Sequence, residues 1–152
     1  MIIKILLSLS IGILGVFLGA QIMEGVLFVP YWKTLPAKDF FELHQTFGKK
    51  IYQFFAPLTI IATILPLITL AYSSFIPTKG RFFIALMGIC TVLFFSTYFL
   101  FFKEANQQFA EASIAYEALP QALETWGNWH WGRIVFEFWA FVFAIIALIN
   151  NR

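Results

Sequence analysis

The stretch that sets the fold class of this chain is residues 51–77, IYQFFAPLTIIATILPLITLAYSSFIP, which holds no charged side chain. A helix rises about 1.5 Å per residue, so an apolar run of this length is long enough to cross the roughly 30 Å of hydrocarbon in a bilayer. We therefore expect a transmembrane helix over residues 52–75. Pro57 and Pro66 lack the backbone N–H that a helix interior uses, and they are expected to kink this helix.

Further apolar runs lie on both sides of this stretch. The run 82–102 is also uncharged. It follows the short turn 78–81, so we expect it to be an antiparallel neighbour of the run 51–77. The run 2–29 is far longer than a signal-peptide core of about 7 to 15 residues, so we interpret it as a span. The predicted spans are residues 3–29, 52–75, 82–102 and 129–149.

Composition is typical of a small helical membrane protein with a single domain, residues 1–152. Of the 152 residues, 61% are hydrophobic and 12% are charged, whereas roughly a quarter are charged in a soluble domain. The net charge of +2 is too small and too scattered to indicate a nucleic-acid partner, so the expected partner is the lipid bilayer. The only cysteine, Cys90, lies inside an apolar run and is expected to be a buried structural thiol.

Two segments between the spans mix charged and apolar residues at helical spacing. Residues 36–50 predict an amphipathic helix lying on the membrane surface, and residues 103–125 predict a second helical excursion interrupted by Pro120. Pro30 and Pro36 are expected to break the helix between the first span and the first connector. The predicted fold is an all-α membrane four-helix bundle with two amphipathic connector helices on one face.

An even number of spans places both connectors at the same membrane face. Almost every unusual polar residue falls at this end: Gln21, Glu24, His44, Asn106, Asn128, His130, Arg133 and Glu137. We expect these side chains to meet in a pocket that opens to this face and is roofed by aromatic residues. The opposite face holds the termini and the short turn, and its density of Lys and Arg favours cytoplasmic termini in a plasma (inner) membrane.

The most informative motif is Trp126–Glu137, WGNWHWGRIVFE. A helix would place four of its side chains in one stripe, at spacings of four, three and four: Trp126, His130, Arg133 and Glu137. In one interpretation, Arg133 and Glu137 pair with each other, and Glu24 is neutral or binds an amide or indole donor. In the other, His130 is a general base tuned by a nearby carboxylate, and Arg133 stabilises an anion formed in the reaction.

Two histidines and two glutamates could converge on a metal ion, but their spacing disfavours this. His130 and Glu137 are about two turns apart, roughly 10 Å of rise, so they cannot both bind one ion from one helix. Glu24, His44 and His130 would have to meet from three elements, and the chain has no HExxH or CxxC pattern. It also has no GxSxG pattern or Gly-rich phosphate loop. We therefore predict no metal and no cofactor.

The order of these features resembles the DUF1772 family of four-helix membrane proteins, also called anthrone oxygenase-like. The resemblance covers a first span with small residues, the following VPYWKTLPAKDF of residues 29–40, an asparagine after the third span, and WGNWHWGR at residues 126–133. Its most specific parts are the asparagine and the pattern Trp-x-x-Trp-His-x-x-Arg, which map onto Asn106, Trp126, Trp129, His130 and Arg133. Family members often have a proline shortly before the asparagine, where this chain has Lys-Glu-Ala.

The resemblance implies a cofactor-independent oxygenase that converts an anthrone to an anthraquinone, or another enzyme acting on a flat aromatic or lipophilic substrate. In this interpretation His130 is the base, Arg133 and Asn106 bind the oxyanion, and Trp126 and Trp129 hold the flat rings. The remaining candidate substrate-binding residues are Gln21, Glu24, His44 and Glu137.

The alternative is a non-enzymatic four-helix scaffold or a protein that binds a lipid or quinone. A small transporter is a third candidate, although the chain has no pair of broken helices in matching halves. The alternatives differ in geometry, because an enzyme needs these residues around an accessible cavity, whereas a scaffold permits them to be sealed together.

Overall fold

The computed structural model describes residues 1–151, which fold into helices joined by short turns and loops. Its elements are α1 (Ile2–Met23), the π-helical turn η1 (Glu24–Phe28), α2 (Val29–Thr34), α3 (Ala37–Phe75), α4 (Arg81–Thr97), the π-helical turn η2 (Tyr98–Phe102), α5 (Lys103–Glu111), the 3-10 turn η3 (Tyr116–Ala118) and α6 (Leu119–Asn150).

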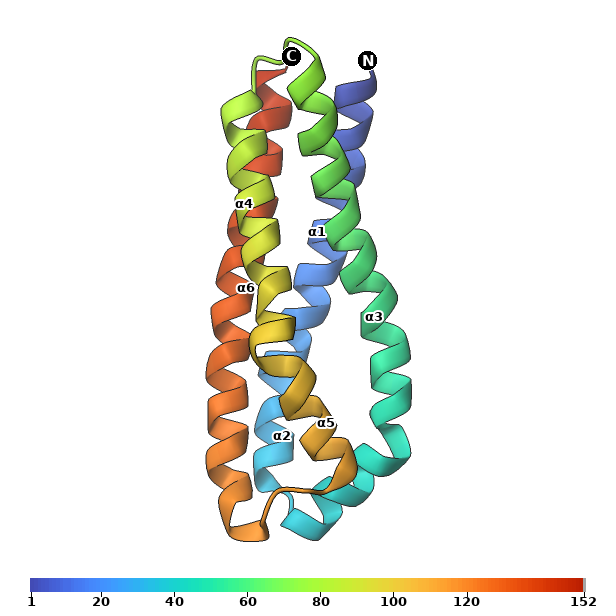
Figure 1. Ribbon diagram of the computed structural model, residues 1–152, viewed down its shortest axis with the longest axis vertical. Coiled ribbons are helices and arrows are strands. Elements are labelled where there is room, and N and C mark those ends of the chain that lie inside the picture. The colour runs from blue at the N-terminus through green and yellow to red at the C-terminus, as the bar shows by residue number, and fades with distance from the viewer. Residues whose placement is uncertain (152) are drawn as a thin grey trace.

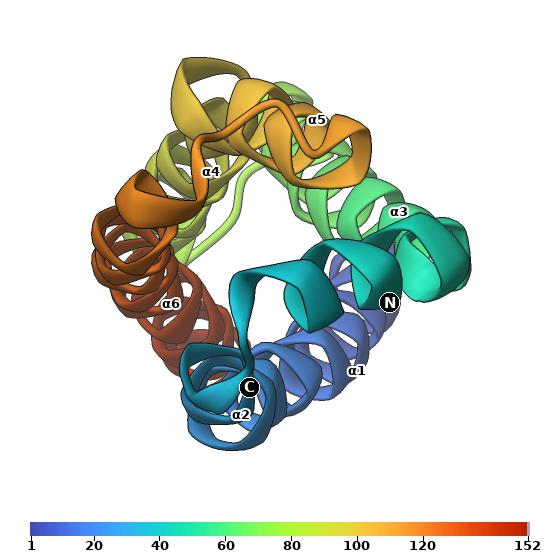
Figure 2. The ribbon, with the colours of Figure 1, turned by 90° about the horizontal axis from the view of Figure 1, so that it is seen from below.

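These elements form four long apolar rods, each long enough to cross a membrane: Ile2–Thr34, Ala37–Phe75, Arg81–Glu111 and Tyr116–Asn150. The rods stand in a ring in which α1 packs against α3 and α6, and α4 packs against the same two helices (Figure 2). Both termini and the α3–α4 turn lie at one end, while the α2–α3 and α5–α6 connections lie at the other (Figure 1). The prediction of an all-α four-helix membrane bundle is thus confirmed.

The bundle has two apolar clusters, one toward each end. The cluster near the termini is built around α6, where Ala140, Ala144 and Ala147 are fully buried and let neighbouring helices approach closely. The cluster at the other end is aromatic, with Phe40, Phe102, Phe109, Trp32 and Trp126 among its members. Along the first rod, the first cluster reaches Phe17 on α1 and the second begins at Val29 on α2, so a gap remains between them.

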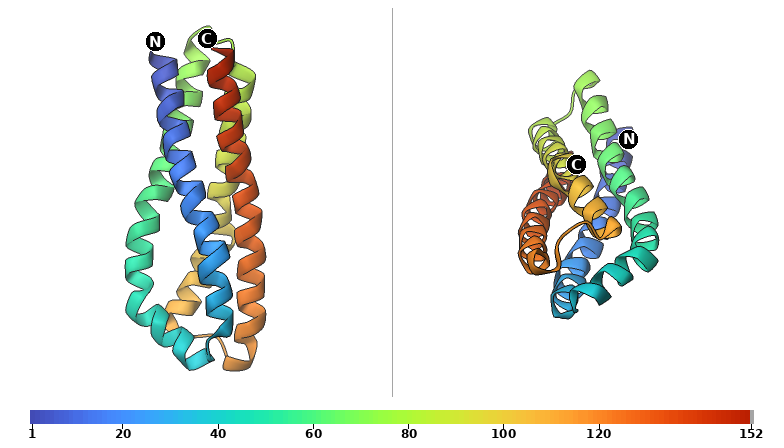
Figure 3. Two further views of the ribbon diagram at one scale, coloured as in Figure 1. Left: turned by 180° about the vertical axis from the view of Figure 1, so that it is seen from behind. Right: turned by 60° about the horizontal axis from the view of Figure 1, so that its bottom comes forward.

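Separate amphipathic connector helices, as predicted for residues 36–50 and 103–125, are not seen within residues 1–151. Residues 37–50 are the first turns of α3, which slant across the lower end of the bundle before the helix rises (Figure 3). Residues 103–111 form α5, which continues the third rod without a break. Both segments are continuous with the adjoining span, so the helices extend beyond the uncharged core instead of ending there.

The three prolines outside the interior of α3 were each expected to interrupt a helix, but they differ in their effect. The first rod continues past Pro30, because the Val29 N–H bonds to the Glu24 carbonyl five residues back, and this wide π turn accommodates the proline. Pro36 does end the first rod, as predicted, and serves as the N-cap of α3. Pro120 lies at the start of α6, where its missing N–H has no helical partner to lose.

Candidate functional site

The gap between the two apolar clusters holds a band of buried polar side chains, which we call the polar belt: Gln21, Glu24, His130, Arg133 and Glu137. Four of them are between 0% and 4% exposed, and the Arg133 side chain is 16% exposed. Two adjacent helical rods supply all five residues, the first and the last. Polar groups at this depth are costly in a bilayer unless they pair or serve a function.

Both ring nitrogens of His130 form hydrogen bonds. Its Nε2 lies 2.9 Å from the backbone carbonyl oxygen of Gln21, and its Nδ1 lies 2.9 Å from Nη2 of Arg133. A guanidinium can only donate, so Nδ1 accepts from Arg133 and Nε2 carries the hydrogen donated to Gln21. The Trp126 ring stacks on the imidazole, with centroids 4.9 Å apart and planes 15° apart. In this arrangement neither nitrogen is free to take another proton.

Arg133 connects the two rods electrostatically. Its Nη2 also donates to Oε2 of Glu24, at 3.3 Å, and its guanidinium carbon lies 4.1 Å from the centre of the Phe102 ring. The arginine therefore pairs across the helix interface with Glu24, and no hydrogen bond joins it to Glu137 one turn away on the same helix within residues 1–151. The Arg133–Glu137 pair that the spacing allowed is therefore not formed within residues 1–151.

Several buried atoms of the polar belt have no hydrogen-bond partner within the described chain. They are Oε1 of Gln21, Nε of Arg133 and both carboxyl oxygens of Glu137. Nearly all buried polar groups in proteins are hydrogen-bonded, so a cluster of such atoms needs an explanation. The set contains one donor and three acceptors, which suits a ligand or water that can both accept and donate.

Two π-helical turns position the partners of Arg133. Glu24 is the first residue of η1, and Phe102 is the last residue of η2, so both rods widen where they meet the guanidinium. π turns inserted in α-helices occur frequently at functional sites. Gly25, inside η1, makes room for the histidine, because a Cβ there would lie 3.1 Å from Cδ2 and Nε2 of His130.

The residues carrying the family resemblance are only partly brought together. Trp126 donates from Nε1 to Oδ1 of Asn106, at 2.9 Å, which joins α6 to α5. Trp129 is 38% exposed and stacks on Phe101, with centroids 5.0 Å apart and planes 3° apart. Asn106 is exposed and bonds to Trp126, so it touches the polar belt through the indole that covers His130.

His44 belongs to the aromatic cluster and not to the polar belt. Its Nδ1 lies 3.0 Å from the carbonyl oxygen of Phe40, and its ring packs edge-on against Trp32 and Phe109. Trp32 in turn packs against Trp126, so one indole separates His44 from the ring that stacks on His130. The structure therefore does not bring the two histidines together.

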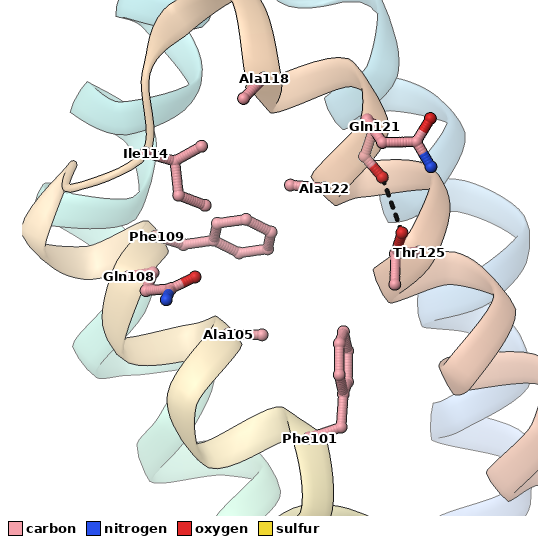
Figure 4. Close-up of a pocket in the computed structure, with 9 residues that line it drawn as sticks. All are labelled: Phe101, Ala105, Gln108, Phe109, Ile114, Ala118, Gln121, Ala122 and Thr125. Carbon is pink, nitrogen blue, oxygen red and sulfur yellow. Dashed lines mark hydrogen bonds between the residues drawn. The ribbon is translucent and has the colours of Figure 1, made fainter.

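Two open pockets lie near this end of the bundle. One, of about 320 Å³, is between α5 and the start of α6 (Figure 4), and one of about 310 Å³ is between α2 and the first turns of α3. Neither is lined by a residue of the polar belt. Sequence reasoning missed Phe102 and Gly25. Phe102 stands in a run of aromatic residues, and nothing in the sequence distinguishes it from its neighbours. The only sequence signal for Gly25 is its position next to Glu24.

Among residues 1–151, no group of three or more His, Cys, Asp or Glu side chains is arranged to hold a metal ion. The site is thus defined by one arginine, one histidine, two glutamates and a glutamine inside a sheath of aromatic rings. No family model, curated protein or solved structure matches this chain.

Proposed function

We propose that this integral membrane protein is a cofactor-independent oxygenase of the anthrone oxygenase-like type, acting on a flat, lipophilic substrate at the polar belt. The observation that supports this most is the set of buried atoms on Gln21, Arg133 and Glu137 that have no partner within residues 1–151. An enolate or phenolate oxygen would accept from the Arg133 Nε, and a substrate hydroxyl would donate to Glu137 or Gln21.

The chemistry needs a base, an anion site and molecular oxygen. Removal of one proton from an activated CH₂ group gives a carbanion stabilised as the enolate. This anion reacts with O₂ and regains a proton to form a hydroperoxide, C–H(OOH), which loses water to leave a C=O group. One O₂ is consumed and one water is released for each CH₂ converted to C=O.

His130 is the proposed base, with Arg133 as its partner. In the resting arrangement Arg133 blocks Nδ1 of His130. A substrate carbonyl oxygen that draws the guanidinium toward itself on binding would release this nitrogen before any proton is removed, so binding and activation of the base would be coupled. Trp126 and Trp129 would hold the ring system, and Asn106 would orient Trp126 through its 2.9 Å hydrogen bond.

The second candidate is a non-enzymatic four-helix scaffold or a protein that binds a lipid or quinone. It is favoured by the complete burial of His130 and by the hydrogen bonds to both of its ring nitrogens. In that case Glu24, His130 and Arg133 fasten the first rod to α6 and have no substrate.

Oxygen uptake separates these two functions. Protein in lipid vesicles is given anthrone and a chelator, and O₂ consumption and anthraquinone formation are followed together. We expect equimolar consumption and formation above the rate of empty vesicles, and a loss of about 10²-fold or more in His130→Gln and Arg133→Gln. Asn128→Ala, exposed on α6, is the control and should keep the full rate. Equal rates in the wild type, in His130→Gln and in empty vesicles would exclude the oxygenase and favour the non-enzymatic function.

A further inference from the structure

Of the two acids in the polar belt, Glu137 is the one without a hydrogen-bond partner within residues 1–151. It is 1% exposed, and neither of its carboxyl oxygens accepts a hydrogen bond there. Glu24, the other acid, accepts from Nη2 of Arg133 at 3.3 Å. An ionised carboxylate can only accept hydrogen bonds, so a buried one without a donor lacks the interactions that would stabilise its charge.

The charges around Glu137 do not balance if both acids are ionised. Arg133 is the only lysine or arginine among residues 126–149 of α6, and the first rod has none between Lys4 and Lys33. The other neighbour of α6, helix α4, has none after Arg81, its first residue. One guanidinium therefore serves two carboxyl groups, and it is already bonded to the other one. A second charge without a counterion is costly inside a bilayer, whereas a carboxylic acid is neutral.

Gln21 offers the acceptor that a neutral acid needs. Helices α1 and α6 are antiparallel (Figure 1), and the Gln21 carbonyl oxygen accepts from Nε2 of His130, seven residues before Glu137. Side chains lean toward the N-terminus of their own helix, so Gln21 and Glu137 lean toward each other along the axis of the bundle. Oε1 of Gln21 is buried and also lacks a partner within residues 1–151. A carboxyl O–H donated to this oxygen would satisfy both groups.

We propose that Glu137 is a neutral carboxylic acid hydrogen-bonded to Gln21, and that it supplies the proton taken up by the peroxide in the oxygenation. The second part rests on the proposed function, whereas the first depends only on the contacts and charges of the polar belt. Glu137 is thus a further catalytic residue, and Gln21 is its positioning residue.

The proton transfers balance with His130 and Glu137 alone. His130 removes one proton from the CH₂ group, O₂ adds to the resulting carbanion, and Glu137 protonates the outer peroxide oxygen to give C–H(OOH). The Glu137 carboxylate then removes the second hydrogen as a proton. The C–H electron pair forms the C=O bond, the O–O bond breaks, and the departing hydroxide takes the proton from His130 to become water. One oxygen atom is reduced in the C=O group and the other in water, and both residues regain their first state.

The spacing of the two residues suits separate proton sites. His130 and Glu137 are seven residues apart on α6, about 10 Å of helical rise, which is too far for a direct transfer between them. The proton removed from the CH₂ group and the proton given to the peroxide are therefore different ones. A substrate that lies between the two side chains would meet the base at one end and the acid at the other.

Infrared spectroscopy tests the neutral acid without any reaction. In a detergent without ester groups, at neutral pH, the wild type is expected to show the C=O band of a protonated carboxyl group. Glu137→Gln should abolish this band, while Glu117→Gln, at an exposed position, should keep it. Gln21→Leu should shift its frequency, because the acid loses its acceptor, and this readout remains if Glu137→Gln does not fold. Absence of the band in the wild type, its persistence in Glu137→Gln or an unshifted band in Gln21→Leu would overturn the proposal.

Two rates test the role in the reaction. With anthrone and protein in vesicles, exchange of the CH₂ hydrogens with D₂O in the absence of O₂ reports the step at His130, and O₂ consumption reports the whole reaction. Glu137→Gln should lower the ratio of O₂ consumption to exchange about tenfold or more, whereas His130→Gln should lower both rates. An unchanged ratio in Glu137→Gln would overturn the role as proton donor. Wild-type rates equal to those of empty vesicles would contradict the oxygenase itself, and the infrared band would still decide whether Glu137 is neutral.

Discussion

Gly25 determines how closely the first rod approaches the His130 ring. A Cβ at this position would lie 3.0 Å from the Trp131 ring and 3.1 Å from the His130 ring, whereas nothing lies within 4 Å of a Cβ at Gly19 on the same rod. We predict that Gly25→Leu displaces the imidazole from the Gln21 carbonyl and lowers the melting temperature in detergent by several degrees, equivalent to about 1–3 kcal/mol of overpacking. Gly19→Leu is the matched control, since its side chain would face outward. Similar melting temperatures for the two variants would show that close approach at Gly25 has no energetic role.

The π turn η1 sets the rotation of one half of the first rod relative to the other. An α-helix turns about 100° per residue, so deleting one residue inside η1 would rotate α2 by roughly this angle. The rotation would carry Trp32, 4% exposed and packed against Trp126, out of the aromatic cluster. We predict that deletion of the outward-facing Val26 lowers the melting temperature far more than Val26→Ala, which keeps the length of the rod. A deletion variant as stable as Val26→Ala would mean that α2 can re-pack in the rotated position.

The four-span arrangement places the α3–α4 turn and the α5–α6 loop on opposite sides of the membrane, and we propose that the termini and the α3–α4 turn are cytoplasmic. In a Cys90→Ser background, a membrane-impermeant maleimide added to intact cells is expected to label Glu117→Cys, while Lys79→Cys reacts only after permeabilisation. The reverse pattern would invert the proposed orientation. Labelling of both cysteines in intact cells would contradict four spans.

The number of spans and their antiparallel order follow from the amino-acid sequence alone. The uncharged runs 51–77 and 82–102 are long enough to cross a bilayer, where their apolar side chains are favourably placed in lipid. A helix is then the structure in which each run can hydrogen-bond all of its own backbone groups. The spacing of Trp126, His130 and Glu137 also predicted one face, and all three are buried on α6. Both results depend on local periodicity, which is a property of the chain alone.

Which polar groups pair depends on how the helices pack. Arg133 is one turn from Glu137 in sequence, yet it bonds to Glu24 and to His130, because the rotation of the first rod brings the Glu24 carboxylate to the guanidinium. That rotation comes from the packing of the first rod against α6, which no local pattern in the sequence encodes. Likewise, the sequence grouped His44 with the polar residues, but its ring packs against Trp32 and Phe109 in the aromatic cluster. Helical periodicity fixes the face on which a side chain lies, whereas its partner depends on how two helices are rotated and spaced relative to each other, and only packing in three dimensions sets that.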